Sequence, residues 1–168
     1  QSKLSRSHFV TKRDTLMSLR VPDLAHTPRL QHLVTAMGDL LQRTQAEADI
    51  LQRGQQLLAQ LVQQDDWLPE EFAQVHPDRY QQFLLYADPQ DRFSVVSFVW
   101  GPGQSTPIHD HTVWGLIGML RGEELTQPFA QDAEGRWMAQ GEKLHLRPGH
   151  VEAVSPTIGD VHRVWNAL

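Results

Sequence analysis

The chain has 168 residues and a mass of 19.2 kDa, with a formal net charge of -5 at pH 7 and no cysteine. This length is enough for one domain with a sizeable core. The acidic balance predicts no nucleic-acid surface, and the lack of cysteine excludes disulfides and thiolate metal ligands. No apolar run approaches the length of a membrane span, so no membrane partner is expected, and no feature indicates a protein partner.

Residues 1–27 are predicted to be a polar N-terminal segment. They begin with a polar, basic stretch and lack the apolar core of a signal peptide. We therefore expect a soluble, cytoplasmic protein.

Residues 28–75 are predicted to be helical. Thr27 and Pro28 are typical of a helix start, with threonine as the N-cap and proline at the first helical position. Two apolar stripes at helical spacing follow: Leu30, Leu33, Val34, Met37 and Leu41, then Ile50, Leu51, Leu57, Leu58, Leu61 and Val62. A glutamine-rich face between them is interpreted as solvated surface. These helices are expected to pack on the outside of a sheet.

Residues 80–168 are predicted to form short strands with Gly- and Pro-rich turns between them. The expected strands are 80–86, 93–100, 108–111, 114–121, 123–129, 137–139, 143–146, 151–155 and 161–166. This pattern is typical of a sandwich or small barrel, so the fold class is predicted to be mainly β.

His109 and His111 are the first candidate metal ligands. An i, i+2 pair on a strand points both imidazoles to one face. With Gly103, Gly115 and Gly122, the pair resembles the first cupin motif, G-x5-H-x-H-x3,4-E-x6-G, except that Gly115 replaces the glutamate ligand. Gly159, His162 and Asn166 resemble the end of the second cupin motif, G-x2-H-x3-N.

These motifs imply one cupin domain over residues 28–168, with a jelly-roll barrel in 80–168 and the helical region 28–75 packed on its outside. The implied ligands are His109, His111 and His162. Three neutral imidazoles supply no negative charge, so a divalent metal there should favour an anionic ligand such as a thiolate.

Further segments resemble the cysteine dioxygenase family of thiol dioxygenases over roughly residues 28–168. They are Tyr80–Leu84, Arg92–Ser94, Trp100–Gly103, His109–Thr112 and the run from His162 to Asn166. The resemblance implies Fe(II), one per chain, and O2-dependent oxidation of a small thiol carboxylate, 3-mercaptopropionate or cysteine, to its sulfinate.

Two positions resemble the bacterial 3-mercaptopropionate dioxygenase branch of that family. Gln82 stands where cysteine dioxygenases carry an arginine for the substrate carboxylate, so Gln82 and Tyr80 are the expected substrate-binding residues. A glutamine offers one hydrogen bond in place of a charged fork. Gly115 matches the cysteine that mammalian members crosslink to a tyrosine, a link that this chain cannot form.

The family also carries a Ser-x-His-x-Tyr relay beyond the third histidine. The sequence ends at Leu168, six residues past His162, so no catalytic residue of that relay is assigned and the cupin domain is expected to continue.

Two alternatives stay open. One is a zinc- or other-metal-dependent cupin enzyme on the same ligands, and the other is a non-catalytic cupin that binds a small anion. Asp110 and Asp160 are candidates for hydrogen bonds to the imidazoles. Outside the predicted centre, His8, His26, His32 and His76 are expected to face solvent, and the roles of His145 and His150 are left open.

Overall fold

The computed structural model describes residues 20–168, so most of the predicted polar segment 1–27 lies outside the described residues. The helical elements are η2 (Leu24–His26), α1 (Pro28–Arg43), α2 (Glu47–Val62) and η3 (Glu70–Phe72). Both α-helices and η3 fall where the apolar periodicity predicts helix. η2 precedes that region.

The start of α1 differs from the prediction in one respect. Pro28 occupies the first helical turn as expected, but Thr27 makes no side-chain capping bond. Its hydroxyl instead donates to the carbonyl oxygen of Asp23 at 3.0 Å, inside the preceding turn. Thr27 is buried there and ties η2 to the helix start.

The rest of the described chain is mainly β. The strands are β1 (Gln81–Ala87), β2 (Ser94–Val99), β3 (Gly115–Gly118), β4 (Glu124–Gln131), β5 (Trp137–Ala139), β6 (Leu144–Leu146), β7 (Val151–Val154) and β8 (His162–Asn166). Each lies within or overlaps a strand that the sequence predicts. Only the predicted strand 108–111 is wrong, because this segment forms a single bridge between His109 and His162 instead of a ladder.

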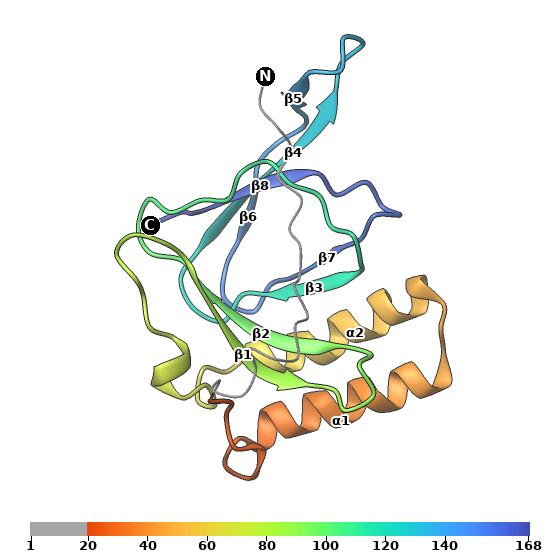
Figure 1. The fold of residues 1–168 in the computed structure, drawn as a ribbon, viewed down its shortest axis with the longest axis vertical. Helices are drawn as coiled ribbons and strands as arrows, with labels where there is room; N and C mark the ends of the chain where they lie inside the picture. Colours follow the sequence, from red (N-terminus) through yellow and green to blue (C-terminus); the bar gives the residue numbers. More distant parts are fainter. Residues whose placement is uncertain (1–19) are drawn as a thin grey trace.

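The strands pair antiparallel in three sheets. β1 pairs with β2, β3 pairs with β7, and β4 pairs with β5, β6 and β8 along different parts of its length. Figure 1 shows β1, β2 and β3 between the helices and the β4–β6–β8 sheet, with the β4–β5 hairpin projecting beyond it. Among the strands of residues 20–168, no ladder joins one of these sheets to the next.

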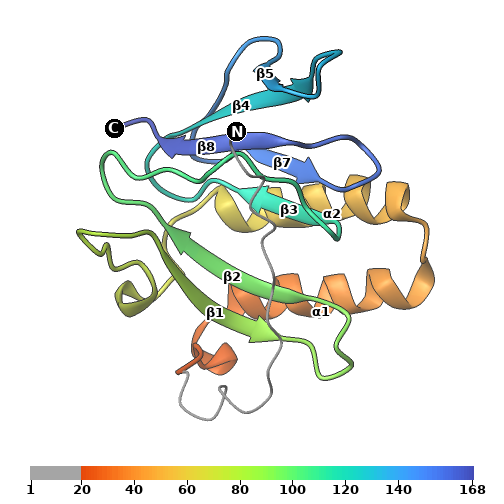
Figure 2. The same cartoon turned by 45° about the horizontal axis from the view of Figure 1, so that its top comes forward.

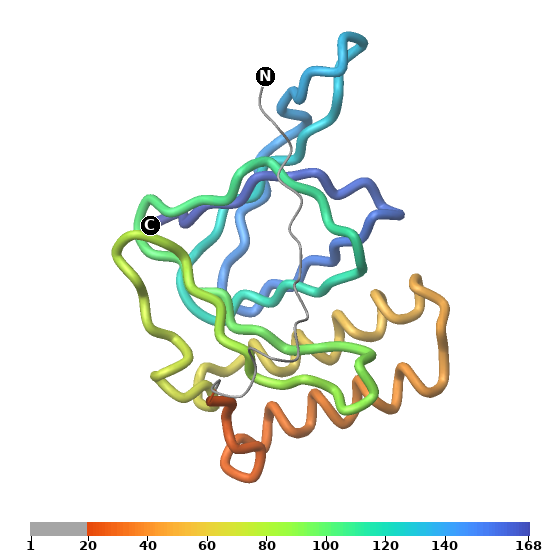
Figure 3. The backbone as a smooth tube through the Cα atoms, in the orientation of Figure 1, coloured from red at the N-terminus to blue at the C-terminus, as the bar shows by residue number. Residues whose placement is uncertain are grey.

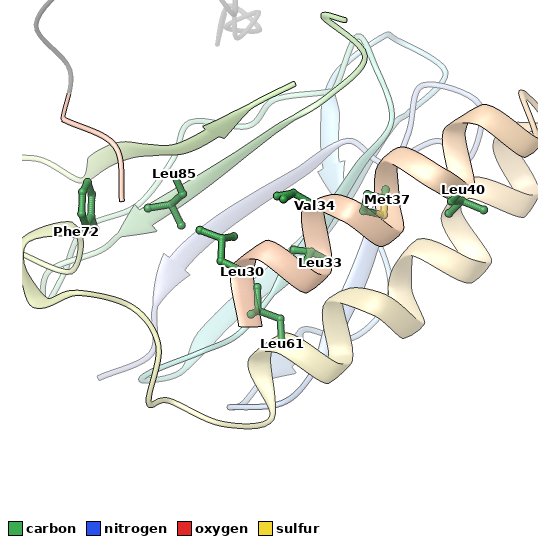
Figure 4. Close-up of a cluster of buried hydrophobic side chains, with 8 residues drawn as sticks. All are labelled: Leu30, Leu33, Val34, Met37, Leu40, Leu61, Phe72 and Leu85. Atoms are coloured by element: carbon green, nitrogen blue, oxygen red, sulfur yellow. The ribbon is translucent and has the colours of Figure 1, made fainter. Parts of the chain in front are cut away.

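The helices cover one side of the strands, as Figure 2 shows from a second angle. Their contact forms the main apolar core: Leu30, Leu33, Val34, Met37, Leu40, Leu61, Phe72 and Leu85 (Figure 4). Full burial of side chains of this size stabilises the fold by about 1.5 to 3 kcal/mol each. The prediction of helices packed outside the strands is confirmed, with Leu40 buried in place of the half-buried Leu41.

Candidate metal centre

The backbone brings His109 and His162 together across 53 residues of sequence. The amide of His109 donates to the carbonyl of His162 at 2.9 Å, and the reverse bond is 3.0 Å long. His162 opens β8, where it lies opposite Pro128 of β4. Two of the three predicted ligands are therefore held by main-chain bonds at one crossing point.

The loop before His109 is held against β8 by residues of the two cupin motifs. Gly103 has φ of 73°, a left-handed conformation that favours glycine. The side-chain amide of Asn166 donates to the carbonyl of Trp100 at 3.0 Å, and its backbone amide donates to the carbonyl of Gln104 at 3.1 Å. Figure 3 shows this loop running alongside β8.

His109, His111 and His162 converge, with one potential ligand atom from each within 4.8 Å of the others. The Nε2 atoms of His109 and His162 are 3.2 Å apart. Two nitrogens that each lie about 2.1 Å from one metal ion are separated by about 3.0 to 3.4 Å at octahedral or tetrahedral angles. The spacing of these two nitrogens therefore fits ligands of a shared ion.

The second nitrogen of two imidazoles is already bonded. His109 Nδ1 donates to the carbonyl of Pro107 at 3.0 Å, and His111 Nδ1 donates to the buried carboxylate of Asp160 at 2.7 Å. Since a carbonyl or carboxylate oxygen can only accept, these Nδ1 atoms carry the protons. In the neutral rings each Nε2 then keeps a free lone pair, as a metal ligand requires.

Burial keeps His109 and His162 uncharged. His162 is 4% exposed, and burial together with the neighbouring His109 and His111 lowers its pKa to about 3. Burial also lowers the pKa of His109, although its bond to Pro107 opposes this shift. Neutral imidazoles are the form that binds a metal, so both rings are prepared to act as ligands at neutral pH.

Gly115 leaves no simple place for the missing glutamate ligand. A Cβ atom at this position would lie 2.9 Å from a methyl group of Val154, across the β3–β7 pair. A larger residue would require that strand pair to shift. The close packing agrees with a centre of three histidines and no carboxylate from this position.

The two predicted substrate-binding residues lie at the start of β1. Gln82 is exposed on β1 opposite Phe98, and Tyr80 lies just before the strand. The Tyr80 ring packs against Trp100, with centroids 4.6 Å apart. Strict alternation along β1 would place Tyr86 on the same face as Tyr80 and Gln82. A bulge between Leu84 and Tyr86 breaks this alternation, and Tyr86 packs against the helical core instead.

The remaining histidines lie outside the cluster. His145 on β6 faces Glu123 at 2.6 Å, and the exposed His150 accepts a bond from the amide of Arg147. His26 and His32 are exposed as predicted, whereas His76 is half-buried. His8 is not among the described residues.

Of the two acidic candidates, only Asp160 contacts an imidazole. Asp110 has a buried Oδ1 atom that has no hydrogen-bond partner among residues 20–168.

Two further polar groups, one on α2 and one on β4, could not be found from the sequence. Glu47, in the first turn of α2, accepts hydrogen bonds from the hydroxyls of Ser155 and Thr157 in the loop that leads to Asp160. Glu124 on β4 is 5% exposed, and burial raises its pKa to about 7, with a smaller contribution from Glu152. Neither group belongs to a motif, and nothing local in the sequence marks either as buried or paired.

The fold and the histidines define a cupin-type protein with a three-histidine centre. The family model for cysteine dioxygenase type I matches residues 17–167. The chain belongs to the cysteine dioxygenase family, which confirms the predicted cupin fold class and the resemblance to that family. Membership implies a thiol dioxygenase, an oxidoreductase whose substrates are a thiol and O2. No helix among the described residues is long and apolar enough to cross a membrane.

Proposed function

We propose that the protein is a non-haem Fe(II) thiol dioxygenase that oxidises a small thiol carboxylate, 3-mercaptopropionate or cysteine, to its sulfinate. His109, His111 and His162 hold one Fe(II) per chain in this proposal. The observation that carries it is the convergence of three histidines, of which His109 donates its Nδ1 proton to Pro107 and His111 donates its Nδ1 proton to Asp160. We further propose that residues 28–168 form a single cupin domain and that the protein is cytoplasmic.

Bound Fe(II) would supply open coordination positions and pass electron density from the thiolate sulfur to O2. The protein's part is to orient the three imidazoles, and to keep His109 and His162 neutral, before any substrate arrives. Because no carboxylate among residues 20–168 joins this cluster of histidines, a bound divalent ion would keep its full charge there. This positive charge would favour the thiolate form of the substrate over the thiol.

Gln82 is proposed to bind the substrate carboxylate, with Tyr80 beside it. The exposed position of Gln82 leaves its amide free to donate to a carboxylate oxygen. The Tyr80 ring packs against Trp100, which directly precedes the loop that leads to His109. An uncharged amide cannot form the bidentate pair of an arginine, so we propose 3-mercaptopropionate as the preferred thiol.

A zinc-dependent cupin enzyme is the second candidate. It is favoured by the same observation, because three histidine nitrogens with an open position also describe catalytic zinc sites. In that case O2 would not be consumed.

The full-length protein, loaded with Fe(II) without oxygen, tests the proposal when oxygen uptake and sulfinate are measured with each thiol. We expect uptake with both thiols and higher kcat/KM with 3-mercaptopropionate. His162→Ala should abolish uptake, whereas His150→Ala, at an exposed histidine outside the cluster, should retain it. Activity with zinc alone, or no uptake with either thiol, would contradict the proposal. Faster turnover of cysteine would contradict only the role given to Gln82.

A further inference from the structure

The loop between β7 and β8 links α2 to the metal centre. Its first residue, Ser155, is 0% exposed. The Ser155 hydroxyl donates a hydrogen bond to Glu47 and accepts one from the backbone amide of Thr157 at 3.1 Å. The Thr157 hydroxyl donates to the same oxygen of Glu47. Figures 1 and 2 show this loop beside the first turn of α2.

The far end of the same loop carries Asp160. Its carboxylate, 8% exposed, accepts the Nδ1 proton of His111 at 2.7 Å. His111 lies outside every strand, as His109 does, but it lacks the main-chain bonds that join His109 to His162. Among the described residues, Asp160 is the hydrogen-bond partner of the His111 ring, which also packs against the rings of His109 and His162.

Residues 158 and 159, between Thr157 and Asp160, are exposed. Two other main-chain bonds hold this loop: the Ile158 amide donates to the Ser155 carbonyl at 3.2 Å, and the Phe129 amide donates to the Val161 carbonyl at 2.8 Å. Gly159 has φ of 68°, in the left-handed region, which lets the chain turn just before Asp160. One end of this short loop must be fixed if its other end is to present a carboxylate to His111 accurately.

Glu47 is attached to a rigid part of the molecule. α2 lies so close to β3 that a Cβ atom at Gly54 would be 2.6 Å from Leu116, and one at Gly118 would be 2.8 Å from Val62. The helix therefore cannot slide over the strands without losing close contacts. The two hydroxyl bonds also lower the pKa of Glu47, which keeps it an acceptor at neutral pH.

We propose that Glu47 is a positioning residue for the metal centre: it fixes the 155–161 loop, so that Asp160 holds the His111 imidazole in the direction that a metal needs. This inference rests on the proposed metal site and adds a remote residue to it. The contact needs one oxygen acceptor and no charge, because both hydroxyls bond to the same Oε1 atom. A glutamine can replace it, and an alanine cannot.

The test is a titration of Co(II) into the full-length protein, in which the visible absorption spectrum and the dissociation constant of the bound Co(II) are measured. Partners of this kind typically change metal affinity by about 10- to 100-fold when removed. We expect Glu47→Ala to weaken Co(II) binding by about 10-fold and to alter the spectrum, while Glu47→Gln keeps most of the affinity. Asp49→Ala removes another acid from the same helical turn and should bind like the wild type.

The route through Asp160 has its own signature. If Glu47 acts through Asp160, Glu47→Ala should weaken Co(II) binding no further in a chain that already carries Asp160→Ala. Thr157→Val removes one of the two hydroxyl bonds to Glu47 and should weaken Co(II) binding by a smaller factor. This variant replaces Glu47→Ala in the test if Glu47→Ala does not fold.

Two results would overturn the inference. The first is that Glu47→Ala lowers the Tm but leaves the Co(II) affinity and spectrum equal to those of Asp49→Ala. The contact would then be purely structural. The second is a full additional loss in the double variant. In both cases the proposed function still stands if the wild-type protein binds Co(II) more tightly than His162→Ala does. If the wild-type protein binds Co(II) no more tightly than His162→Ala, the proposed function is overturned as well.

Discussion

The helical side of the molecule and the strands around the histidines are packed on different principles. Between α1, α2 and β1 the buried side chains are almost all apolar and contact one another. On β4 and β8, buried polar groups such as Glu124, Thr126 and His162 lie among the strands. The first region supplies stability, and the second holds groups in states that would be unfavourable elsewhere, as a functional centre requires.

His162→Ala should separate the two regions most strongly. It removes a proposed ligand that His109 and His111 cannot replace, so we expect Co(II) or Fe(II) affinity to fall by at least about 100-fold. The helical core is untouched, so Tm without metal should change little. His150→Ala, at an exposed histidine, is the control for titration of metal against protein. Equal metal binding by both variants would contradict the three-histidine centre.

Leu30→Ala should have the opposite profile. Leu30 is 0% exposed in the helical core, and replacing such a leucine lowers the free energy of unfolding by about 2 to 5 kcal/mol. Metal affinity of the remaining folded protein should stay within a few-fold of the wild type. Leu144→Ala, at a leucine that is 48% exposed, is the matched control for urea unfolding. A loss of metal affinity as large as that of His162→Ala would show that the two regions are not separable.

Glu124→Gln should stabilise the polar region in a pH-dependent way. Burial raises the pKa of Glu124 from 4.5 to about 7, so between these values the folded chain holds a proton that the unfolded chain has lost. Stability should therefore fall as pH rises through this window and stay lower above it. The variant removes this loss, and its free energy of unfolding at pH 8 should exceed that of the wild type by up to about 3 kcal/mol.

At pH 4 the gain from Glu124→Gln should nearly vanish, because the carboxyl is protonated in both states. Glu142→Gln, at an exposed position, should show no such pH dependence. Urea unfolding at the two pH values measures the difference, and a gain that is the same at both would refute the buried-acid explanation.

Thr126→Val should give the smallest effect. Thr126 is 2% exposed, and its hydroxyl has no hydrogen-bond partner in the described part of the chain. Replacing it with a methyl group should raise the free energy of unfolding by about 1 kcal/mol, or Tm by about 2 to 4 °C. Thr35→Val, on the exposed face of α1, is the control in calorimetry. A lower Tm for Thr126→Val would mean that the hydroxyl is bonded.

The two regions also differ in how far the sequence predicts them. The helices were predictable because apolar spacing in α1 and α2 reports directly on which face is buried. The motif histidines were predictable as a set, since the glycine frame and Asn166 mark the same loop crossing that the structure shows. The predicted strand at 108–111 was wrong, because His109 forms a single bridge with the distant His162 and no ladder with a neighbouring segment.

The polar contacts were beyond local reasoning for a physical reason. Ser155 lies 108 residues from Glu47, and no pattern along the chain reports a hydrogen bond of that range. A glutamate in a strand, such as Glu124, is normally interpreted as solvent-facing, since alternation alone does not say which face is buried. The bulge between Leu84 and Tyr86 likewise changes the strand face on which Tyr86 lies, and no residue pattern along β1 predicts it.

Isotope labelling tests the central claim most directly. The full-length Fe(II) protein is given 3-mercaptopropionate under 18O2, and the sulfinate is analysed by mass spectrometry. A three-histidine thiol dioxygenase should place two labelled oxygen atoms in each sulfinate product. Product without label, or no sulfinate from a protein that binds Fe(II), would contradict the account.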